Sequence, residues 1–543
     1  MERKQALIAL LVFAVAAAPR IYYMNAGLYH TDSVIEALAV EKTYATKSLT
    51  YMHAPGYPGQ VVVVTAFYAL QRLLGGPVSA EFAATFASAI MGALAVVAAY
   101  FFVREYLESE EAALFSALIL TVFPVFLSIS AYAKDHTTEA FFLLAAAYFA
   151  TKARKKASLK LTVVASLLLG FAAGVRIVNF MFYPIFLLLL WDGRLPITYV
   201  MEDGVYKIKP SRNIKDVAFE LAAAILPSLL VFLLLYAKMF ATDGLEPLRS
   251  VSEYAGFLGV YSQVMPLSIK WATFSLTKAG WLLAAAGLIL LGRKSPYRAA
   301  TLLLWFLFFF IYSGNLRITT PRYVIPGLIS LTFLIGYFFS EIYRRINAVF
   351  AIICVLILAA AMFNAIRPIL EFRKDFSGPK EFALSVRKTT EPNAVIITMD
   401  ESYHLQYYGN RSTISHPTNG DPAKIEENMQ KIRSLLDDGT PIYMGSTAFS
   451  YDTADNLQYD RASGALINSL TGKPYTRLAY DPNSKSIKQL ETGLVVPLTG
   501  RWMLELFQTF KVTYIGSYDN EDWHHNDITE GKFKEHLFKI EAY

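Results

Sequence analysis

The stretch Leu-Tyr-His-Thr-Asp-Ser-Val-Ile-Glu, residues 28–36, decides how the rest of the chain is interpreted. It follows directly on the first hydrophobic segment, and on a helix Asp32 and Glu36 lie four residues apart on one face. Carboxylates beside a membrane are costly, so they either face solvent on an amphipathic surface helix or carry out chemistry. A second motif, His53-Ala-Pro-Gly-Tyr-Pro58, follows before the next apolar run.

Composition places the chain in a broad class. Its 543 residues are 55% hydrophobic and only 17% charged, and the mean hydropathy is +0.37. These values are typical of a polytopic membrane protein. The net charge of +6 is carried by short Lys/Arg clusters between apolar runs, so no basic domain indicates nucleic acid as a partner. The single cysteine, Cys354, lies in an apolar run, which argues against disulfides, Cys-rich zinc sites and thiol catalysis.

The N-terminus resembles a signal peptide, because a short basic start precedes the apolar run Leu7–Ala18. The apolar character resumes through Ile21–Met24, and the acidic stretch follows at once. We therefore interpret this segment as an uncleaved first helix. Arg3 and Lys4 then place the N-terminus in the cytoplasm.

The topology depends on Gln60–Leu74, which at about 15 residues is short for crossing a hydrocarbon core of roughly 30 Å. If this run lies along the membrane interface, the clusters Lys152–Lys156, Arg293–Arg298 and Arg344-Arg345 all fall inside. We therefore predict a juxtamembrane helix here and about eleven transmembrane helices, with the C-terminus outside. The predicted spans are Leu7–Met24 and residues 82–103, 111–130, 137–151, 159–175, 177–191, 216–240, 274–292, 299–313, 322–340 and 346–363.

From about Arg373 the composition becomes mixed and polar. Residues 371–543 are therefore predicted to form a soluble extracytoplasmic α/β domain. Its sequence has no Gly-rich phosphate loop and no Walker motif. The expected elements are short strands at Val395–Met399, Thr413–Ser415, Pro441–Met444 and Val512–Gly516, and a helix at Ala423–Asp437.

With this topology, the polar residues near membrane depth gather on the outer face. Each has a simpler explanation: an arginine can extend to the headgroups, and Asp135 can cap the helix that follows it. Together they favour a functional site, because charged groups embedded near a bilayer are usually paired or functional. The set consists of Asp32, Glu36 and His53, then Lys134-Asp135-His136, Arg176, Asn179, Arg317, and Arg322-Tyr323.

These residue types suit transfer from a lipid-linked phosphate donor. Arginines offer planar forks for a phosphate, and a carboxylate in a semi-buried cleft can accept a proton from an acceptor hydroxyl. A phosphate leaving group, with a second pKa near ~6, needs charge stabilisation and no general acid. Cytoplasmic nucleotide sugars would not reach the outer face, so the donor is expected to carry a lipid tail.

The order of these motifs resembles the GT-C class of integral-membrane glycosyltransferases. The resemblance is closest to the branch that contains protein O-mannosyltransferases and lipid A aminoarabinose transferases, and it covers about residues 1–363. Each motif is short, but their order is fairly specific. The motifs are the acidic stretch with Asp32, His53-Ala-Pro-Gly-Tyr-Pro, Tyr132-Ala-Lys-Asp135, Gly170-Phe-Ala-Ala-Gly-Val-Arg176 and Pro321-Arg322-Tyr323-Val-Ile-Pro326.

The resemblance implies inverting transfer of one sugar from a polyprenyl (dolichyl or undecaprenyl) phosphate to a protein hydroxyl, a glycan or a lipid. Asp32 corresponds to the general base and Asp135 to the second external acidic motif. Many relatives have an Asp-Glu pair where this chain has Asp32-Ser33, so Glu36 is a candidate for the second carboxylate. Donor phosphate or sugar contacts are expected from His53, His136, Arg176, Asn179, Arg317, Arg322 and Tyr323.

The sequence therefore predicts a polytopic α-helical GT-C membrane domain at 1–370, with external juxtamembrane helices at 28–74, and the α/β domain at 371–543. The protein is placed in the plasma membrane, or in the endoplasmic reticulum of a eukaryote. No cofactor is required for the expected hexosyl or pentosyl transfer. One alternative is a lipid-linked oligosaccharide transferase, in which Asp32 and Asp135 would hold a divalent metal. Others are a lipid or sugar carrier and an adhesion or scaffold protein.

Overall fold

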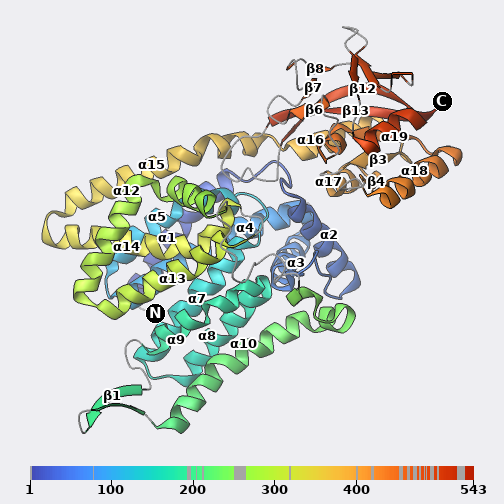
Figure 1. Ribbon diagram of the computed structural model, residues 1–543. Coiled ribbons are helices and arrows are strands. Elements are labelled where there is room, and N and C mark those ends of the chain that lie inside the picture. The colour runs from blue at the N-terminus through green and yellow to red at the C-terminus, as the bar shows by residue number, and fades with distance from the viewer. Residues whose placement is uncertain are drawn as a thin grey trace. The chain divides into compact units, whose positions relative to one another are not determined.

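The computed structural model spans residues 1–543 and divides into two compact units. The helical unit contains Met1–Met24 and Ala39–Glu371, and the C-terminal unit contains Asn25–Leu38 and Phe372–Tyr543. Each unit is described by itself (Figure 1). The structure describes all residues except 1–2, 77–78, 192–196, 203–204, 211–212, 250–263, 317–319, 399–400, 417–420, 452–456, 461–464, 469–471, 473, 476–477, 482, 485, 490–494, 498–499 and 522–531.

In its described residues, the helical unit is built almost entirely from helices, with one hairpin of strands β1 (Ile197–Glu202) and β2 (Val205–Pro210). Helix α2 (Thr31–Thr46) begins in the C-terminal unit and ends in the helical unit. The others are α1 (Arg3–Tyr22), α3 (Pro58–Leu73), α4 (Ala80–Leu107), α5 (Glu110–Thr121), α6 (Pro124–Ser130), α7 (His136–Lys155), α8 (Leu159–Val175), η1 (Ile177–Phe182), α9 (Tyr183–Trp191), α10 (Ile214–Asp243), α12 (Val264–Lys294), α13 (Pro296–Gly314), η2 (Pro321–Val324), α14 (Ile325–Arg345) and α15 (Ala348–Asp375).

Serine caps fix where several helices begin. Ser79, Ser109 and Ser158 precede α4, α5 and α8, and each hydroxyl accepts a hydrogen bond from the backbone N–H three residues later. The donor–acceptor distances are 3.3, 3.1 and 3.5 Å. Such caps satisfy N–H groups that have no partner within the helix. The short polar breaks between apolar runs therefore define the helix boundaries.

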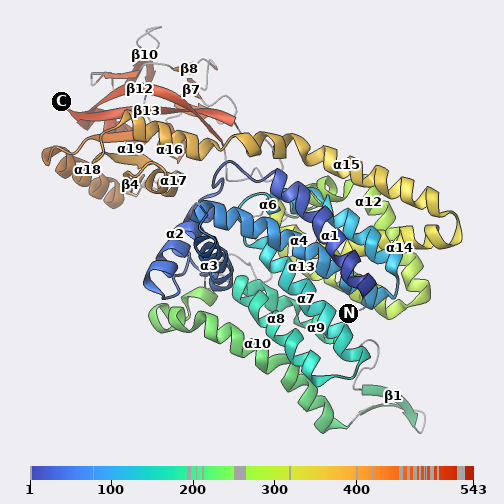
Figure 2. The same ribbon diagram turned by 180° about the vertical axis from the view of Figure 1, so that it is seen from behind.

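Small residues let the helices pack closely. A Cβ added to Gly170 of α8 would lie 2.6 Å from the Cα of Ser228 in α10, and one added to Gly336 of α14 would lie 2.7 Å from the carbonyl oxygen of Ala112 in α5. Figure 2 shows α8 and α10 running side by side. Interfaces between membrane helices are rich in small residues for this reason, because dispersion contacts replace the hydrophobic effect there.

In the described part of the chain, seven helices are long and apolar enough to cross a membrane, or up to eight if the bent pair α5 and α6 forms one span. Helix α8 and the η1–α9 segment are apolar but shorter. The protein is thus a polytopic membrane protein, while the count of eleven spans stays a prediction. The predicted juxtamembrane run Gln60–Leu74 is the helix α3, and its position at the interface also stays a prediction.

Ion pairs join the three basic clusters at one end of the helical unit. Glu108, after α4, pairs with Lys155 of α7 at 3.2 Å and with Arg298 of α13 at 2.9 Å. Close by, at the start of α5, Glu111 pairs with Arg344 of α14. The clusters that the positive-inside argument placed on one side of the membrane therefore do lie at one end of these helices. That this end faces the cytoplasmic side of the membrane stays a prediction.

The C-terminal unit is built around a five-stranded sheet in the order β12-β13-β5-β3-β4. Strand β3 is parallel to β4 and β5, whereas β13 is antiparallel to β5 and β12. The buried core includes Trp502, Ile425 and Phe538. The sheet strands are β3 (Val395–Thr398), β4 (Ser412–Ser415), β5 (Ile442–Gly445), β12 (Phe510–Glu521) and β13 (Lys532–Ala542); the helices are α16 (Gly378–Thr389), α17 (Ser402–Tyr407), α18 (Pro422–Asp437) and α19 (Arg501–Thr509).

The strands expected near 395, 413, 441 and 512 and the helix expected at 423–437 are confirmed as β3, β4, β5, β12 and α18. A short 3₁₀ helix, η4 (Ser446–Tyr451), follows β5. Six further short strands form two antiparallel three-stranded sheets. These are β6 (Leu457–Asp460), β7 (Ala465–Asn468), β8 (Pro474–Tyr475), β9 (Leu478–Asp481), β10 (Ser486–Gln489) and β11 (Val495–Pro497).

The Gly287→Ala variant tests the close packing of α12 on α14. A Cβ at Gly287 would lie 2.7 Å from the carbonyl carbon of Leu334, which is backbone and cannot rotate away. We expect destabilisation of about 1–3 kcal/mol, seen as a lower thermal unfolding midpoint in detergent. Gly292→Ala on the same helix is the control, because its Cβ would meet only Ala299 Cβ at 3.9 Å. Equal midpoints for the two variants would contradict the packing.

Candidate functional site

Asp135 stands at the junction of α6 and α7, and its backbone and side chain have separate roles. Its carbonyl accepts the first helical hydrogen bond of α7, from the N–H of Glu139 at 2.9 Å. Its carboxylate makes no cap hydrogen bond. Instead Oδ1 lies 3.1 Å from Nδ1 of His136, and Oδ2 accepts from Nη1 of Arg176 at 3.0 Å. The alternative that Asp135 is only a helix cap is therefore wrong.

Arg176 comes from the break between α8 and η1. Its extended backbone (φ −146°, ψ 120°) ends α8, and its N–H still bonds the carbonyl of Ala172. The buried guanidinium contacts three groups of α7: Asp135, Nε2 of His136 at 2.9 Å, and Oε2 of Glu139 at 3.5 Å. Arg176 therefore does not extend to the membrane surface. It joins α7 and α8 at the end opposite the basic clusters.

His136 contacts the guanidinium of Arg176 and the carboxylate of Asp135, and these two contacts determine its tautomer. Nη1 of Arg176 can only donate, so Nε2 of His136 is the acceptor of that bond. The remaining ring proton is then on Nδ1, where it can be donated to Asp135 Oδ1. A neutral His136 thus completes a chain of hydrogen bonds from Arg176 to Asp135.

The 3₁₀ helix η2 adds Arg322 and Tyr323 to the same cluster. The side chain of Arg322 is buried, and its Cζ lies 5.6 Å from the centre of the Tyr323 ring. The Cζ of Arg176 lies 5.1 Å from the same ring, and the ring of His136 lies 5.8 Å from it. Tyr323 therefore contacts both arginines by cation–π interactions.

Asn179 supports this arrangement from η1. It is fully buried, and its Nδ2 donates to the carbonyl of Ala172 at 2.9 Å, which closes the turn that carries Arg176. The structure thus brings together six of the predicted residues. They are Asp135, His136, Arg176, Asn179, Arg322 and Tyr323.

Sequence reasoning missed Glu139, which is almost fully buried in the same cluster. Apart from its 3.5 Å ion pair with Arg176, neither carboxylate oxygen accepts a hydrogen bond among the residues that the structure describes. The signal was present: Asp135 and Glu139 have the same four-residue spacing as Asp32 and Glu36. Lys134 and Arg322 are also buried, and they act electrostatically on Asp135 and His136 respectively, so basic side chains gather around these two residues.

His53 lies outside the buried part of this cluster. Its ring is exposed, Nδ1 is 2.8 Å from the carbonyl of Ala54, and the ring packs edge-on against Tyr57. The Ala54–Pro55 peptide is cis, and Tyr57 has a left-handed backbone (φ 49°). Tyr57, which the sequence analysis did not select, interacts electrostatically with Arg176. The predicted Arg317 lies outside the described residues.

Asp32 and Glu36 belong to the C-terminal unit rather than to the helical unit. Asp32 is in the first turn of α2, and its side chain is 26% exposed. Its N–H donates to Nδ1 of His30 at 3.0 Å, while its Oδ2 lies 3.4 Å from the same nitrogen. Because Nδ1 accepts a hydrogen bond, the ring proton of a neutral His30 is on Nε2. Glu36 is buried one turn later.

The predicted carboxylates show no assembled metal centre. Among the described residues, no group of three or more His, Cys, Asp or Glu side chains could hold a metal ion. Both oxygens of Asp135 already contact His136 and Arg176. These contacts favour an ionic hydrogen-bond network at Asp135, while a metal bound by Asp32 and Asp135 stays an untested alternative.

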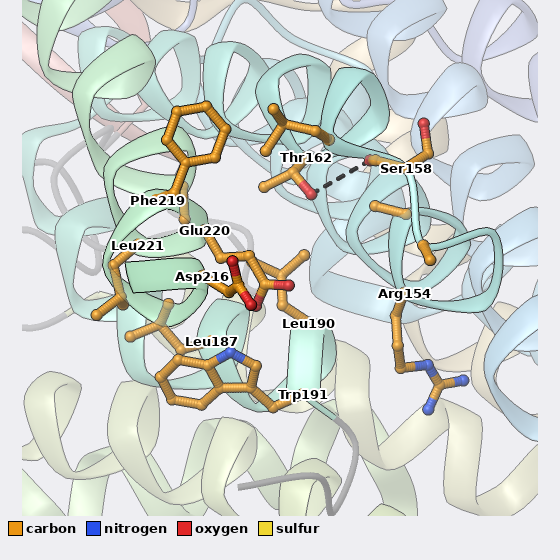
Figure 3. A pocket seen from close by; sticks show the side chains of 14 residues that line it. Arg154, Ser158, Thr162, Leu187, Leu190, Trp191, Asp216, Phe219, Glu220 and Leu221 are labelled. Carbon is orange, nitrogen blue, oxygen red and sulfur yellow. Dashed lines mark hydrogen bonds between the residues drawn. The ribbon is translucent and has the colours of Figure 1, made fainter. Parts of the chain in front are cut away.

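A cavity of about 510 Å³ lies at the other end of α7 and α8 (Figure 3). It is lined by the end of α7, the start of α8, the end of α9 and the start of α10. In Figure 3 the carboxylates of Asp216 and Glu220 lie close together above Trp191. None of the predicted site residues lines it. With a rise of 1.5 Å per residue, α7 separates this cavity from Asp135 by roughly 30 Å, so the two are different sites.

The energetic role of Arg176 can be tested in a double-mutant cycle with Asp135. Arg176→Gln removes the direct ion-pair partner of Asp135 and Glu139, so we expect a loss of about 3–5 kcal/mol in the free energy of unfolding. Adding Asp135→Asn should recover part of that loss, because one of the two carboxylates that lost this partner is then neutral. Thermal unfolding in detergent of the single and double variants measures both effects.

Arg104→Gln is the control for this cycle. It breaks a single ion pair with Glu110 whose side chains are 29% and 39% exposed, so the expected loss is below about 1 kcal/mol. Equal losses for Arg104→Gln and Arg176→Gln, or strict additivity in the cycle, would contradict the buried network.

Comparison with known proteins gives a family match over part of the chain. The family model described as dolichyl-phosphate-mannose-protein mannosyltransferase matches residues 62–201. This range contains Asp135, His136, Glu139, Arg176 and Asn179. No curated protein matches the sequence significantly.

Solved structures match the fold over most of the chain at low identity. ArnT from Cupriavidus metallidurans in the apo state has a TM-score of 0.57 and 14% identity, with 81% of this chain and 91% of that chain covered. A second ArnT structure holds undecaprenyl phosphate, at a TM-score of 0.53, 13% identity, and 83% and 94% coverage. The oligosaccharyltransferase AglB of Archaeoglobus fulgidus, with an inhibitory peptide and a dolichol-phosphate, has a TM-score of 0.54, 14% identity, and 91% and 74% coverage.

These matches agree with the architecture described above. All three structures share the fold over at least four fifths of this chain, although fewer than one residue in six is identical. The family match falls on the part of the chain that carries the buried Asp135 and Arg176. The chain therefore has the fold of the GT-C class of integral-membrane glycosyltransferases.

Proposed function

We propose that this protein transfers a single sugar, with inversion, from a polyprenyl-phosphate sugar to an extracytoplasmic hydroxyl acceptor, with Asp32 as the general base. The observation that carries the proposal is that the basic side chains of Arg176, Arg322 and Lys134 gather around Asp135 and His136. Guanidinium groups bind phosphate oxygens through charge-assisted hydrogen bonds, so this cluster suits a phosphate. The family match and the polyprenyl phosphates bound by two of the similar structures support the same donor class.

Within the cluster we assign different roles to the two arginines. Arg176 already contacts Asp135, His136 and Glu139, so its main role is to hold α7 and α8 in place. Arg322 is buried beside Tyr323 and acts electrostatically on His136, and its guanidinium is the proposed contact to the donor phosphate. Tyr323, whose ring contacts both arginines, would cover the sugar-phosphate linkage.

Asp32 has the properties that a general base needs. It is partly exposed, so an acceptor hydroxyl can approach it, and its backbone N–H donates to Nδ1 of His30, which fixes the turn that carries the carboxylate. A base and a phosphate-binding site are sufficient, because the departing phosphate carries its own negative charge and needs no proton. Glu36 is buried, so we propose that it contributes to the electrostatic field around Asp32 and does not transfer the proton.

A lipid-linked oligosaccharide transferase is the second candidate. It is favoured by the fold similarity to AglB, which extends over 91% of this chain. The two candidates are distinguished by their donors. Purified protein in nanodiscs is incubated with radiolabelled polyprenyl-phosphate monosaccharides, or with lipid-linked oligosaccharide plus divalent metal, and with envelope extract as acceptor. Consumption of a monosaccharide donor without metal supports the proposal, and consumption of only the oligosaccharide donor overturns it.

Asp32→Asn tests the assignment of the base. The amide keeps the shape of the carboxylate but cannot accept a proton, so turnover should fall by at least about 10²-fold while donor binding stays nearly unchanged. Turnover is measured with the donor identified in the panel, and binding with the polyprenyl phosphate alone. A folded Asp32→Asn protein with near wild-type turnover would remove Asp32 as the base.

Arg322→Ala tests the phosphate contact. Losing a charge-assisted hydrogen bond of about 1.5–3 kcal/mol should weaken polyprenyl-phosphate binding by about 10- to 150-fold. Arg298→Ala, at the opposite end of α13, is the control and should leave the affinity unchanged. If Arg322→Ala keeps both its unfolding midpoint and wild-type affinity, Arg322 is not in the phosphate site.

A further inference from the structure

The C-terminal unit encloses the chain segment that leads into α2. We call Asn25–His30 the connecting segment; within it Leu28, Tyr29 and His30 are buried. A Cβ added to Gly27 would lie 2.6 Å from Cδ of Lys380 and 3.0 Å from Oγ of Ser377. The segment is therefore packed against residues that lie about 350 positions later in the sequence.

Two residues of the connecting segment have both backbone groups held by this unit. The N–H of Ala26 donates to the carbonyl of Arg373 at 3.0 Å, and the carbonyl of Ala26 accepts from Nζ of Lys380 at 2.8 Å. The N–H of Leu28 donates to the hydroxyl of Tyr408 at 2.9 Å, and the carbonyl of Leu28 lies 3.1 Å from Nε2 of His404. Because the N–H and the carbonyl of both Ala26 and Leu28 are bonded, the backbone between them has little freedom to rotate.

Side chains add to these backbone contacts. Nη2 of Arg373 donates to the hydroxyl of Tyr29 at 2.8 Å, and its Cζ lies 3.9 Å from the centre of the same ring. Arg373 and His404 are both almost fully buried. Burial lowers the pKa of His404 to about 4, so the ring is neutral at physiological pH and its Nε2–H can donate to Leu28.

Asp32 follows the connecting segment within one helical turn. His30, the last residue of the segment, accepts the N–H of Asp32 and so fixes the first turn of α2. Rotation of the backbone at Leu28 would therefore change the direction in which the Asp32 carboxylate points. In proton transfer a displacement of about 1 Å can cost roughly 10²-fold in rate.

We propose that the C-terminal unit positions the candidate base: Tyr408 and His404 hold the Leu28 backbone and thereby orient Asp32. This inference rests on the proposed function for its effect on turnover. Its structural part, the restraint of residues 25–36, stands independently of the reaction. Tyr408 and His404 act through the backbone, so they are positioning residues and not catalytic residues.

The experiment compares Tyr408→Phe with Tyr443→Phe in the full-length protein. Each change removes one hydroxyl from the same unit, but the hydroxyl of Tyr443 bonds Glu391 and does not contact the connecting segment. Hydrogen exchange of residues 25–36 should become faster, by about five-fold or more, in Tyr408→Phe, and it should stay at the wild-type rate in Tyr443→Phe. With the donor found above, kcat should fall several-fold in Tyr408→Phe at unchanged KM for the donor.

A second pair of variants distinguishes positioning from general destabilisation. His404→Ala removes the donor to Leu28, whereas His404→Gln replaces it with an amide N–H of similar reach. We expect His404→Gln to restore slow exchange and most of kcat relative to His404→Ala. A merely structural role would lower the unfolding midpoint in both variants without this recovery of kcat.

The outcomes separate the two proposals. If the wild type consumes no donor, the proposed function fails, and exchange alone decides whether residues 25–36 are restrained by Tyr408 and His404. Unchanged exchange in Tyr408→Phe and His404→Ala overturns the inference. Faster exchange with unchanged kcat also overturns it, because Asp32 would then not depend on the restraint.

Discussion

The helical unit depends on one constraint, which is that the guanidinium of Arg176 is largely removed from water. Asp135, Glu139 and His136 surround it, and all three come from the first five residues of α7 and its cap. A buried ion pair of this kind adds little net stability, because the cost of desolvation offsets most of the attraction. Leaving any partner out is far more costly. The start of α7 and the end of α8 must therefore meet, and the break that follows α8 leads into η1.

Close backbone packing satisfies this constraint at the helix ends. A Cβ on Gly59 of α3 would lie 2.8 Å from the backbone of both Gly174 and Val175, so the start of α3 packs directly on the last turn of α8. That contact carries the Tyr57 loop toward Arg176, which explains why a loop far away in sequence interacts with the guanidinium. A second contact of this kind involves Arg20 of α1, which donates to the carbonyls of Leu120 and Thr121 where α5 ends and the chain bends into α6. The bend sets the path of the chain to Asp135.

Much of this could be predicted because the signals are local or compositional. The strands β3, β4 and β5 follow from short β-branched runs, and the polar residues of the cluster are conspicuous because they interrupt apolar segments. Glu139 was missed because it lies inside α7 rather than in a break between apolar runs, so only its four-residue spacing from Asp135 points to it. The assignment of residues 25–38 to the C-terminal unit had no sequence signal. It depends on backbone hydrogen bonds to Arg373, Lys380, His404 and Tyr408, and backbone groups are the same in every residue.

Because residues 25–38 belong to it, the C-terminal unit is more than a domain appended to the end of the chain. A separate appended domain would have its own core and few contacts with the preceding sequence. Here the core around Trp502 is complete in itself, yet the unit also supplies the partners of Ala26 and Leu28. Without the residues after Phe372, four backbone groups and the ring of Tyr29 would lose the contacts that hold them, and the start of α2 would lose its fixed direction. The proposed base is therefore held by the C-terminal unit, while the proposed phosphate-binding cluster is formed by the helical unit alone.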